Sequence, residues 1–276
     1  MQAARGRFLR LLAGTASLAG GLCDLVFSPR CAACDAELVD PAAGPFCAEC
    51  NKEALAGAGE RCPRCGAELP PDHADTGCPA CGSTELATRL SSPNSEVRGR
   101  RGAVQRVWCL GAYDGSLRAL VLRMKHVEEE PLSAAMAELL WRRVGAELAG
   151  WRPDVVLPVP MHWTRRLARG TNSPQVVSGV LARRLEVPHA PKALVRRRKT
   201  RQQGPLTRTA RRINLRRAFA VPAGVRFEQA RVLLVDDILT SGATSSEAAR
   251  ELRRAGASAT ALVVVAQTGL PDAVPR

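Results

Sequence analysis

The sequence predicts an α/β domain with a doubly wound parallel sheet, preceded by a small cysteine-rich module. Three observations predict this fold class. After residue 104, short apolar runs alternate with helical patterns, which is typical of parallel sheets. Eight of the ten cysteines form four C-x-x-C pairs before residue 90. The 276 residues, 46% of them hydrophobic, suffice for one domain of about 150–200 residues and a smaller one.

Residues 1–27 are predicted to form an amphipathic helix that packs on the rest of the protein. Arg5, Arg7 and Arg10 precede an apolar stretch, as they would in an export signal or a membrane anchor. However, the apolar residues recur at helical spacing, the run contains Asp24, and it is too short for a convincing membrane span. We therefore expect no membrane span and a cytoplasmic protein.

The four C-x-x-C pairs are separated by 12, 11 and 12 residues. Two thiolates two residues apart fit on one turn around a tetrahedral ion, so the pairs predict two structural Cys₄ zinc sites. Neighbouring pairs are expected to share an ion, with interleaved pairing as the alternative. A secreted disulfide framework is the competing interpretation, and the lack of a persuasive export signal argues against it. The expected zinc ligands are Cys31, Cys34, Cys47, Cys50, Cys62, Cys65, Cys78 and Cys81. Cys23 and Cys109 lie on apolar stretches and are expected to be core residues.

The predicted domains are an N-terminal helix (1–27), a double zinc ribbon (28–90), a polar linker (91–103) and an α/β domain (104–270). Within the last, strands are expected at 107–113, 154–160, 231–235 and 259–266. Helices are expected at 116–125, 132–148, 174–185 and 243–255, and shorter strand-like pieces at 193–197 and 218–221.

The segment 231–244, RVLLVDDILTSGAT, carries the most specific functional signal. A buried apolar run is followed by Asp236 and Asp237 at the carboxyl end of the strand, where open α/β sheets bind ligands. The next residues begin a helix, and backbone N–H groups there favour a phosphate. Adjacent carboxylates can accept hydrogen bonds from a sugar diol, with Mg²⁺ offsetting their charge. The alternative is a strand whose final Asp caps a helix. The expected phosphate-binding residues are Thr240, Ser241, Gly242, Ala243 and Thr244.

This segment closely resembles the 5-phosphoribosyl-1-pyrophosphate (PRPP) motif of type I phosphoribosyltransferases. The resemblance implies that Asp236 and Asp237 hold the ribose hydroxyls and that residues 240–244 hold the 5′-phosphate. A second strand end, at 155–159, precedes a run of cations and is a candidate pyrophosphate site, although a rigid turn with surface arginines is the alternative. The candidate pyrophosphate-binding residues are Lys125, Arg165 and Arg169.

The net charge of +14 is unevenly distributed, because residues 187–227 contain twelve Lys or Arg and no Asp or Glu. Such a block predicts an anionic partner, which is nucleic acid, a polyphosphate ligand or both. A basic surface without a dedicated ligand is the alternative. The candidate nucleic-acid-binding residues are Arg196, Arg197, Arg198, Lys199, Arg201, Arg211 and Arg212.

Five blocks in order resemble the ComF family over residues 22–266: the cysteine pairs, YDGSLR with LRMK, PVPMHWTRRLARGTNSPQ, RRRKTRQQGPLTRTARRINLRRAFAV and the PRPP-like motif. The family implies a zinc module before a phosphoribosyltransferase-like domain, associated with natural competence and incoming single-stranded DNA. Competence or recombination proteins are then further expected partners. Thr171 and Ser173 depart from the family's aromatic and Gln, which weakens the expectation of a base contact at that loop.

Two functions follow from these patterns. The first is a transferase that moves the 5-phosphoribosyl group from PRPP to an unidentified acceptor. The second is a PRPP-responsive protein that binds single-stranded nucleic acid without catalysis. A zinc-ribbon adaptor for other proteins is compatible with both.

Overall fold

The computed structural model describes residues 28–70, 77–81, 103–161, 172–197, 215 and 217–269. The chain divides into two compact units, residues 1–51 and residues 52–276, and each is described by itself. The predicted N-terminal helix and all but the last residue of the predicted linker lie outside the described residues. Within the described part of the chain, no helix is both long enough and apolar enough to cross a membrane.

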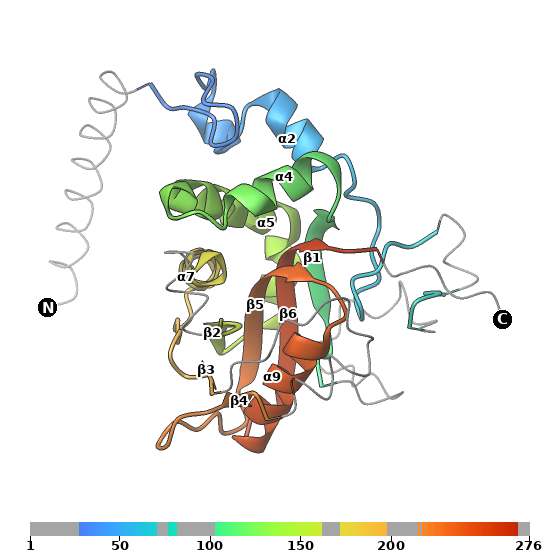
Figure 1. Ribbon diagram of the computed structural model, residues 1–276, viewed down its shortest axis with the longest axis vertical. Helices are drawn as coiled ribbons and strands as arrows, with labels where there is room; N and C mark the ends of the chain where they lie inside the picture. The colour runs from blue at the N-terminus through green and yellow to red at the C-terminus, as the bar shows by residue number, and fades with distance from the viewer. Residues whose placement is uncertain are drawn as a thin grey trace, which may run out of the picture. The chain divides into compact units, whose positions relative to one another are not determined.

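The second unit is built on a four-stranded sheet whose strands are all parallel (Figure 1). The strand order is β1-β6-β5-β2. The bounds are β1 (Val107–Ala112), β2 (Val155–Pro158), β5 (Arg231–Leu239) and β6 (Ala259–Gln267). The two central strands are apolar on both faces, because helices cover both. The predicted parallel α/β fold is thereby confirmed.

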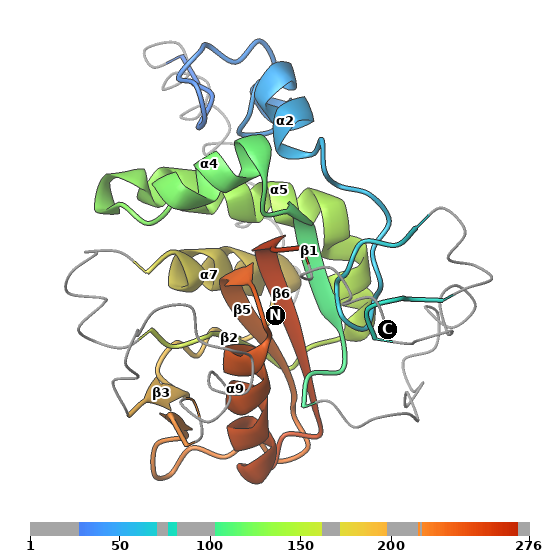
Figure 2. The ribbon, with the colours of Figure 1, turned by 45° about the vertical axis from the view of Figure 1, so that its right-hand side comes forward.

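Helices cover the sheet on opposite sides (Figures 1 and 2). Val232 and Leu234 of β5 pack in one cluster with Leu252 of α9. On the other side, α7 contacts β2 and β5, and α5 packs against α7 and β1. The helices are α4 (Gly115–Arg123), α5 (Glu130–Trp151), α7 (Ser173–Leu185) and α9 (Ala243–Arg254), with a short 3-10 turn, η2 (Val127–Glu129), between α4 and α5. This arrangement leaves the carboxyl ends of the strands as the edge where a ligand can bind.

Strand β5 is longer than the sequence predicted. Its expected end at Val235 is wrong, because the strand continues to Leu239. Pairing with β6 extends it: Asp236 lies opposite Val264, and Ile238 lies opposite Ala266. The two aspartates therefore belong to the last part of a paired strand, which fixes their backbone more firmly than a loop would.

Both edges of the sheet are covered by other parts of the chain. At the β1 edge, the N–H of Val107 donates to the carbonyl of Pro63 at 3.0 Å, and the carbonyl of Gly57 lies close to Gly111. At the β2 edge, Val156 exchanges backbone hydrogen bonds with residues 188 and 190. Covered edges protect a sheet from pairing with other chains. The segment that covers β1 is the beginning of the second cysteine-rich module.

Two further strands form a separate antiparallel pair at the base of the basic segment. These are β3 (Val195–Arg196) and β4 (Phe219–Ala220), whose residues pair as Val195 with Ala220 and Arg196 with Phe219. Glu247 of α9 is buried and accepts a hydrogen bond from the N–H of Arg217 at 2.8 Å. The chain is therefore held against α9 just before β4 begins.

Candidate functional site

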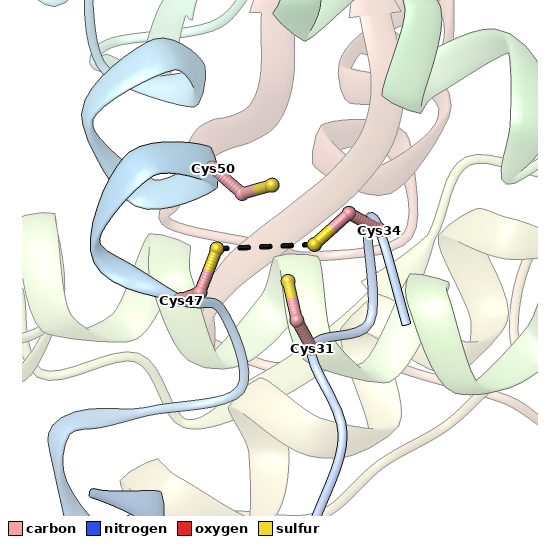
Figure 3. Close-up of side chains that lie close together, drawn as sticks. All are labelled: Cys31, Cys34, Cys47 and Cys50. Atoms are coloured by element: carbon pink, nitrogen blue, oxygen red, sulfur yellow. Dashed lines mark hydrogen bonds between the residues drawn. The ribbon is translucent and has the colours of Figure 1, made fainter. Parts of the chain in front are cut away.

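The first unit holds a cluster of four cysteines, Cys31, Cys34, Cys47 and Cys50. Cys31 and Cys34 come from a turn, Cys47 directly precedes α2 (Ala48–Ala54), and Cys50 lies within α2. The short 3-10 turn η1 (Pro41–Ala43) comes before α2 in the chain. Their four sulfurs point toward a common centre (Figure 3) and all lie within 4.8 Å of one another. The Sγ atoms of Cys34 and Cys47 are 3.9 Å apart.

The second unit holds the other cluster, Cys62, Cys65, Cys78 and Cys81. The Sγ atoms of Cys62 and Cys81 are 3.7 Å apart, as are those of Cys65 and Cys78. Zn–S bonds of about 2.3 Å in a tetrahedron require sulfurs about 3.8 Å apart, so both clusters fit zinc. The described cysteines form no disulfides. Neighbouring C-x-x-C pairs share a site, which confirms the expected sequential pairing.

The two modules repeat a longer sequence that our sequence analysis missed. RCAACDAEL at 30–38 matches RCPRCGAEL at 61–69. In both copies the arginine before the first cysteine donates from Nη1 to the carbonyl of the residue after the second, at 2.9 Å for Arg30 and Asp35 and 3.2 Å for Arg61 and Gly66. Asp35 and Gly66 both have left-handed backbone, with φ of 63° and 75°. The self-similarity of the two segments was the signal that could have revealed this arginine.

Hydrogen bonds within each site shift the pKa values of its thiols in opposite directions. Burial alone would raise the pKa of Cys31, but backbone N–H groups of Cys47, Cys34 and Ala33 lower it to about 6. A hydrogen bond from Cys65 lowers the pKa of Cys62 to about 5, against the opposing effect of burial. Thiolates, not thiols, are the metal ligands. Burial and hydrogen bonds with neighbouring cysteines raise the pKa of Cys50, and the hydrogen bond with Cys62 raises that of Cys65. Each site thus has a thiol that ionises readily beside one that does not, and a bound Zn²⁺ would favour the thiolate form of both.

The two zinc sites differ in exposure. Cys34 of the first site is exposed, whereas Cys62 and Cys78 of the second are each only 1% exposed. The second site also packs within the unit that contains the sheet. Zinc in the second site is accordingly the more protected from solvent and chelators.

The carboxylate pair lies near the end of β5. The N–H of Asp237 donates to Oδ1 of Asp236 at 3.0 Å, and the N–H of Ile238 donates to Oδ1 of Asp237 at 2.8 Å. Both residues are partly exposed. Each carboxylate thus has one oxygen held by backbone, and although both residues keep some exposed surface, the Asp236 carboxyl itself is surrounded by protein.

The predicted phosphate-binding residues form the turn between β5 and α9. Gly242 has a φ of 68°, a conformation that favours glycine, and it precedes the first residue of α9. Its carbonyl accepts from the N–H of Ser246 at 2.9 Å and from the hydroxyl of Ser245 at 3.1 Å. No side chain caps this helix end among the described contacts. The N–H groups of the first turn are therefore oriented as an anion-binding helix terminus would require.

The pKa of the Asp236 carboxyl is shifted by its surroundings. Burial raises the pKa of the Asp236 carboxyl well above its usual range, and the neighbouring charge of Asp237 raises it further. The charge of Arg196 acts in the opposite direction. Arg196 also stacks its guanidinium over Phe219, 5.6 Å from the ring centre. The sequence analysis assigned Arg196 to nucleic acid, whereas the structure places it within electrostatic reach of the aspartates.

The other predicted site residues either make no described contact with the aspartates or lie outside the described part of the chain. Lys125 follows α4 and is partly exposed, and no described contact joins it to the aspartates. Arg197 is exposed beside Arg196. Cys109 is buried, as predicted. The predicted residues outside the described part of the chain are Cys23, Arg165, Arg169, Arg198, Lys199, Arg201, Arg211 and Arg212.

Comparison with known families matches both parts of the chain. Residues 22–82 match the double zinc ribbon domain, and residues 174–272 match the phosphoribosyl transferase domain. The second match includes the aspartate pair and the loop that follows it. Together with the parallel sheet, it identifies the fold of the second unit as a phosphoribosyltransferase fold.

Curated relatives with a similar sequence are named for competence or for DNA utilization. Competence protein F of Haemophilus influenzae is 31% identical over 151 residues, covering 53% of this chain and 66% of that protein. DNA utilization protein YhgH of Escherichia coli K12 is 30% identical over 162 residues, covering 56% of this chain and 69% of that protein. This chain therefore spans about two thirds of the relatives' length.

The solved structures that match the chain include two phosphoribosyltransferases. The purine phosphoribosyltransferase from Pyrococcus horikoshii is 19% identical, with a TM-score of 0.34, covering 51% of this chain and 78% of that chain. The orotate phosphoribosyltransferase from Aeropyrum pernix is also 19% identical, with a TM-score of 0.31, covering 51% of this chain and 62% of that chain.

Proposed function

The chain belongs to the ComF family, and we propose that it binds PRPP together with Mg²⁺ and transfers the 5-phosphoribosyl group to an acceptor. The observation that carries this proposal is the direct succession of the Asp236 and Asp237 carboxylates and the glycine-containing turn into α9. In PRPP the ribose diol and the 5′-phosphate lie close together. This segment offers carboxylate acceptors for the diol, followed by backbone N–H donors for the phosphate.

The proposed roles follow from the geometry. Asp236 and Asp237 each have one oxygen held by backbone, and their other oxygens accept hydrogen bonds from the ribose hydroxyls. The first turn of α9 donates N–H groups to the 5′-phosphate. Burial and the neighbouring charge of Asp237 raise the pKa of Asp236, and a divalent cation would favour its ionised form. Mg²⁺ bound with PRPP would neutralise charge on the departing pyrophosphate.

In the proposed transfer, the bond between C1′ and the pyrophosphate oxygen breaks, and the pyrophosphate leaves with the electron pair. The sugar passes through a cationic state, and a nucleophilic acceptor forms the new bond to C1′. The protein acts mainly by positioning the sugar and by stabilising charge. Arg196 is suited to the second task because its charge already acts on the carboxylate site.

Transfer is tested by pyrophosphate release. Zinc-loaded protein with Mg²⁺ and PRPP is incubated with nucleobases, nucleosides and single-stranded DNA as acceptors, and pyrophosphate is measured by a coupled assay. The Asp236→Asn/Asp237→Asn double variant is the control for contaminating enzymes. Acceptor-dependent release by wild type alone supports the transferase. PRPP binding without release for every acceptor would instead favour a binding protein.

Arg196 and Arg197 provide a matched pair for separating the two anion sites. We expect Arg196→Gln to weaken PRPP binding about 10-fold, because one charge-assisted contact contributes roughly 1.5 kcal/mol. Arg197→Gln should leave PRPP binding unchanged, because its side chain is exposed. Calorimetric titration of both variants measures this difference. Equal PRPP affinities for the two variants would remove Arg196 from the site.

A second candidate function is binding of single-stranded DNA. It is favoured by the absence of acidic residues among 187–227 and by relatives named for competence and DNA utilization. The chain has one Tyr and five Phe, so base stacking contributes little and phosphate contacts dominate. Handling of incoming DNA, with PRPP as a regulatory ligand, is the corresponding proposal.

Salt dependence tests the DNA proposal directly. The logarithm of the affinity for single-stranded DNA should fall linearly with the logarithm of the salt concentration, with a slope of about −0.7 for each phosphate contact. Arg197→Gln should reduce the magnitude of this slope by about 0.7. Fluorescence anisotropy with a labelled oligonucleotide provides the measurement. A slope near zero in wild type would exclude the basic segment as a nucleic-acid site.

A further inference from the structure

A buried glutamine joins the second zinc site to the sheet. Gln267 is the last residue of β6 and is 5% exposed. Its Nε2 donates to the carbonyl of Cys65, a zinc ligand, at 3.3 Å. Its Oε1 lies 3.9 Å from the thiol of Cys109, which in turn lies 3.9 Å from the carbonyl of Gly66. The polar groups of Gln267 are thus satisfied by the zinc module and by β1.

The contact between the module and the sheet is tight. A Cβ atom on Gly66 would lie 2.4 Å from Oε1 of Gln267 and 2.8 Å from a methyl carbon of Val107. Gly66 also has a φ of 75°, so both its backbone and its lack of a side chain are required here. The turn that carries Cys65 therefore packs directly on the first residue of β1 and on the side chain of the last residue of β6.

The residue after Gln267 is hydrogen-bonded to the strand that leads into the predicted phosphate loop. Gln267 lies opposite Leu239 in the β5–β6 register, and the N–H of Thr268 donates to the carbonyl of Leu239 at 2.9 Å. On its other side, the carbonyl of Gln267 accepts from the N–H of Tyr113 at 2.7 Å. Leu239 is the residue before Thr240. Two hydrogen bonds therefore connect a zinc ligand to the beginning of the loop. The first joins the Gln267 side chain to Cys65, and the second joins the adjacent Thr268 to Leu239.

We propose that Gln267 is a positioning residue that holds the second zinc site against the sheet and, through Leu239, fixes the start of the turn at 240–244. Partners that orient metal ligands from outside the coordination sphere typically change metal affinity 10- to 100-fold when they are replaced. Zinc in the second site is then a support for the candidate sugar-phosphate site as well as for its own module.

The test uses zinc-loaded full-length protein carrying Gln267→Met, which preserves the length of the side chain and removes both polar groups. Zinc is withdrawn with a chelator, and alkylation of each cysteine is followed by mass spectrometry of peptides, so that the two sites are read separately. We expect Cys62, Cys65, Cys78 and Cys81 to become alkylated about 10- to 100-fold faster than in wild type. The four cysteines of the first site should keep the wild-type rate.

Hydrogen exchange provides the second readout, because a merely local effect on zinc would not reach the loop. Amide exchange of residues 239–244 should become faster in Gln267→Met. The control is Ser178→Ala, which removes a buried hydrogen bond of 2.8 Å to His189 near the opposite edge of the sheet. Ser178→Ala should change neither the alkylation of the second site nor exchange at 239–244.

The outcomes separate this inference from the proposed function. Unchanged alkylation in Gln267→Met, or an equal change in Ser178→Ala, would overturn the positioning role. Faster alkylation with unchanged exchange at 239–244 would overturn the connection to the loop. If Gln267→Met does not fold, Gln267→Asn keeps the amide and shortens the side chain by one methylene, which withdraws the donor from the carbonyl of Cys65. Neither readout uses PRPP, so a failure to bind PRPP leaves both interpretable.

Discussion

Cys62→Ser is expected to prevent stable folding of the unit that contains the sheet, whereas Cys31→Ser should leave that unit folded. Cys62 is a ligand in a buried site within the second unit. Structural zinc binding contributes on the order of 10 kcal/mol in small zinc domains. A whole domain is stable by only about 5–15 kcal/mol, so the loss of this zinc is comparable to the total. Cys31 belongs to the first unit.

Chemical denaturation followed by tryptophan fluorescence measures the difference, because Trp108 of β1 and Trp151 of α5 pack edge to face with ring centres 6.1 Å apart. In Cys31→Ser the transition should keep its wild-type midpoint. In Cys62→Ser it should be lost or shifted to much lower denaturant. A cooperative transition at the wild-type midpoint in Cys62→Ser would show that the sheet does not depend on the second zinc.

Asp236→Asn should make the ligand-free protein more stable while it weakens PRPP binding. The pKa of Asp236 is raised by burial and by the charge of Asp237, so ionisation of this carboxyl in the folded state costs stability. Asparagine preserves the shape and removes the charge. Loss of one charged acceptor for a ribose hydroxyl should weaken PRPP binding about 10- to 100-fold.

The stability gain should depend on pH. Because the folded-state pKa lies above the unfolded value of about 3.9, wild type has its full contribution from Asp236 below that pH and loses it as the pH rises through the folded pKa. The Asn variant has no such loss. The difference in Tm, measured by differential scanning calorimetry without ligand, should therefore be small near pH 4 and larger at pH 8. The opposing charge of Arg196 reduces the effect but does not reverse its sign. A variant less stable than wild type at pH 8 would contradict an energetic cost of ionising the Asp236 carboxyl in the folded protein.

The sequence predicted those features that depend on local patterns. The C-x-x-C spacing predicted both metal clusters and their sequential pairing, because a tetrahedral ion restricts where its ligands can lie. The apolar runs predicted the four parallel strands, and the order of Asp236, Asp237 and the glycine-containing turn placed them at one end of the sheet. The true end of β5 at Leu239 was not predicted, since it depends on pairing with β6, a contact between distant segments.

The features that sequence analysis missed also depend on contacts between distant segments. Gln267 looks like the end of an ordinary apolar strand, and only the docking of the second module on β1 explains why a buried amide lies there. Arg196 was assigned with its basic neighbours because composition cannot distinguish a residue within electrostatic reach of Asp236 from one that is not. Arg30 and Arg61 could have been found, because the repeated RCxxCxAEL segment contains both.

Binding of PRPP is the most direct test of the account. Zinc-loaded wild type is titrated with PRPP in Mg²⁺ by calorimetry, beside the Asp236→Asn/Asp237→Asn double variant, whose folding is checked by its thermal transition. We predict saturable binding by wild type and no detectable binding by the folded double variant. Absence of binding in wild type, or equal binding by both proteins, would contradict a sugar-phosphate site at the end of β5.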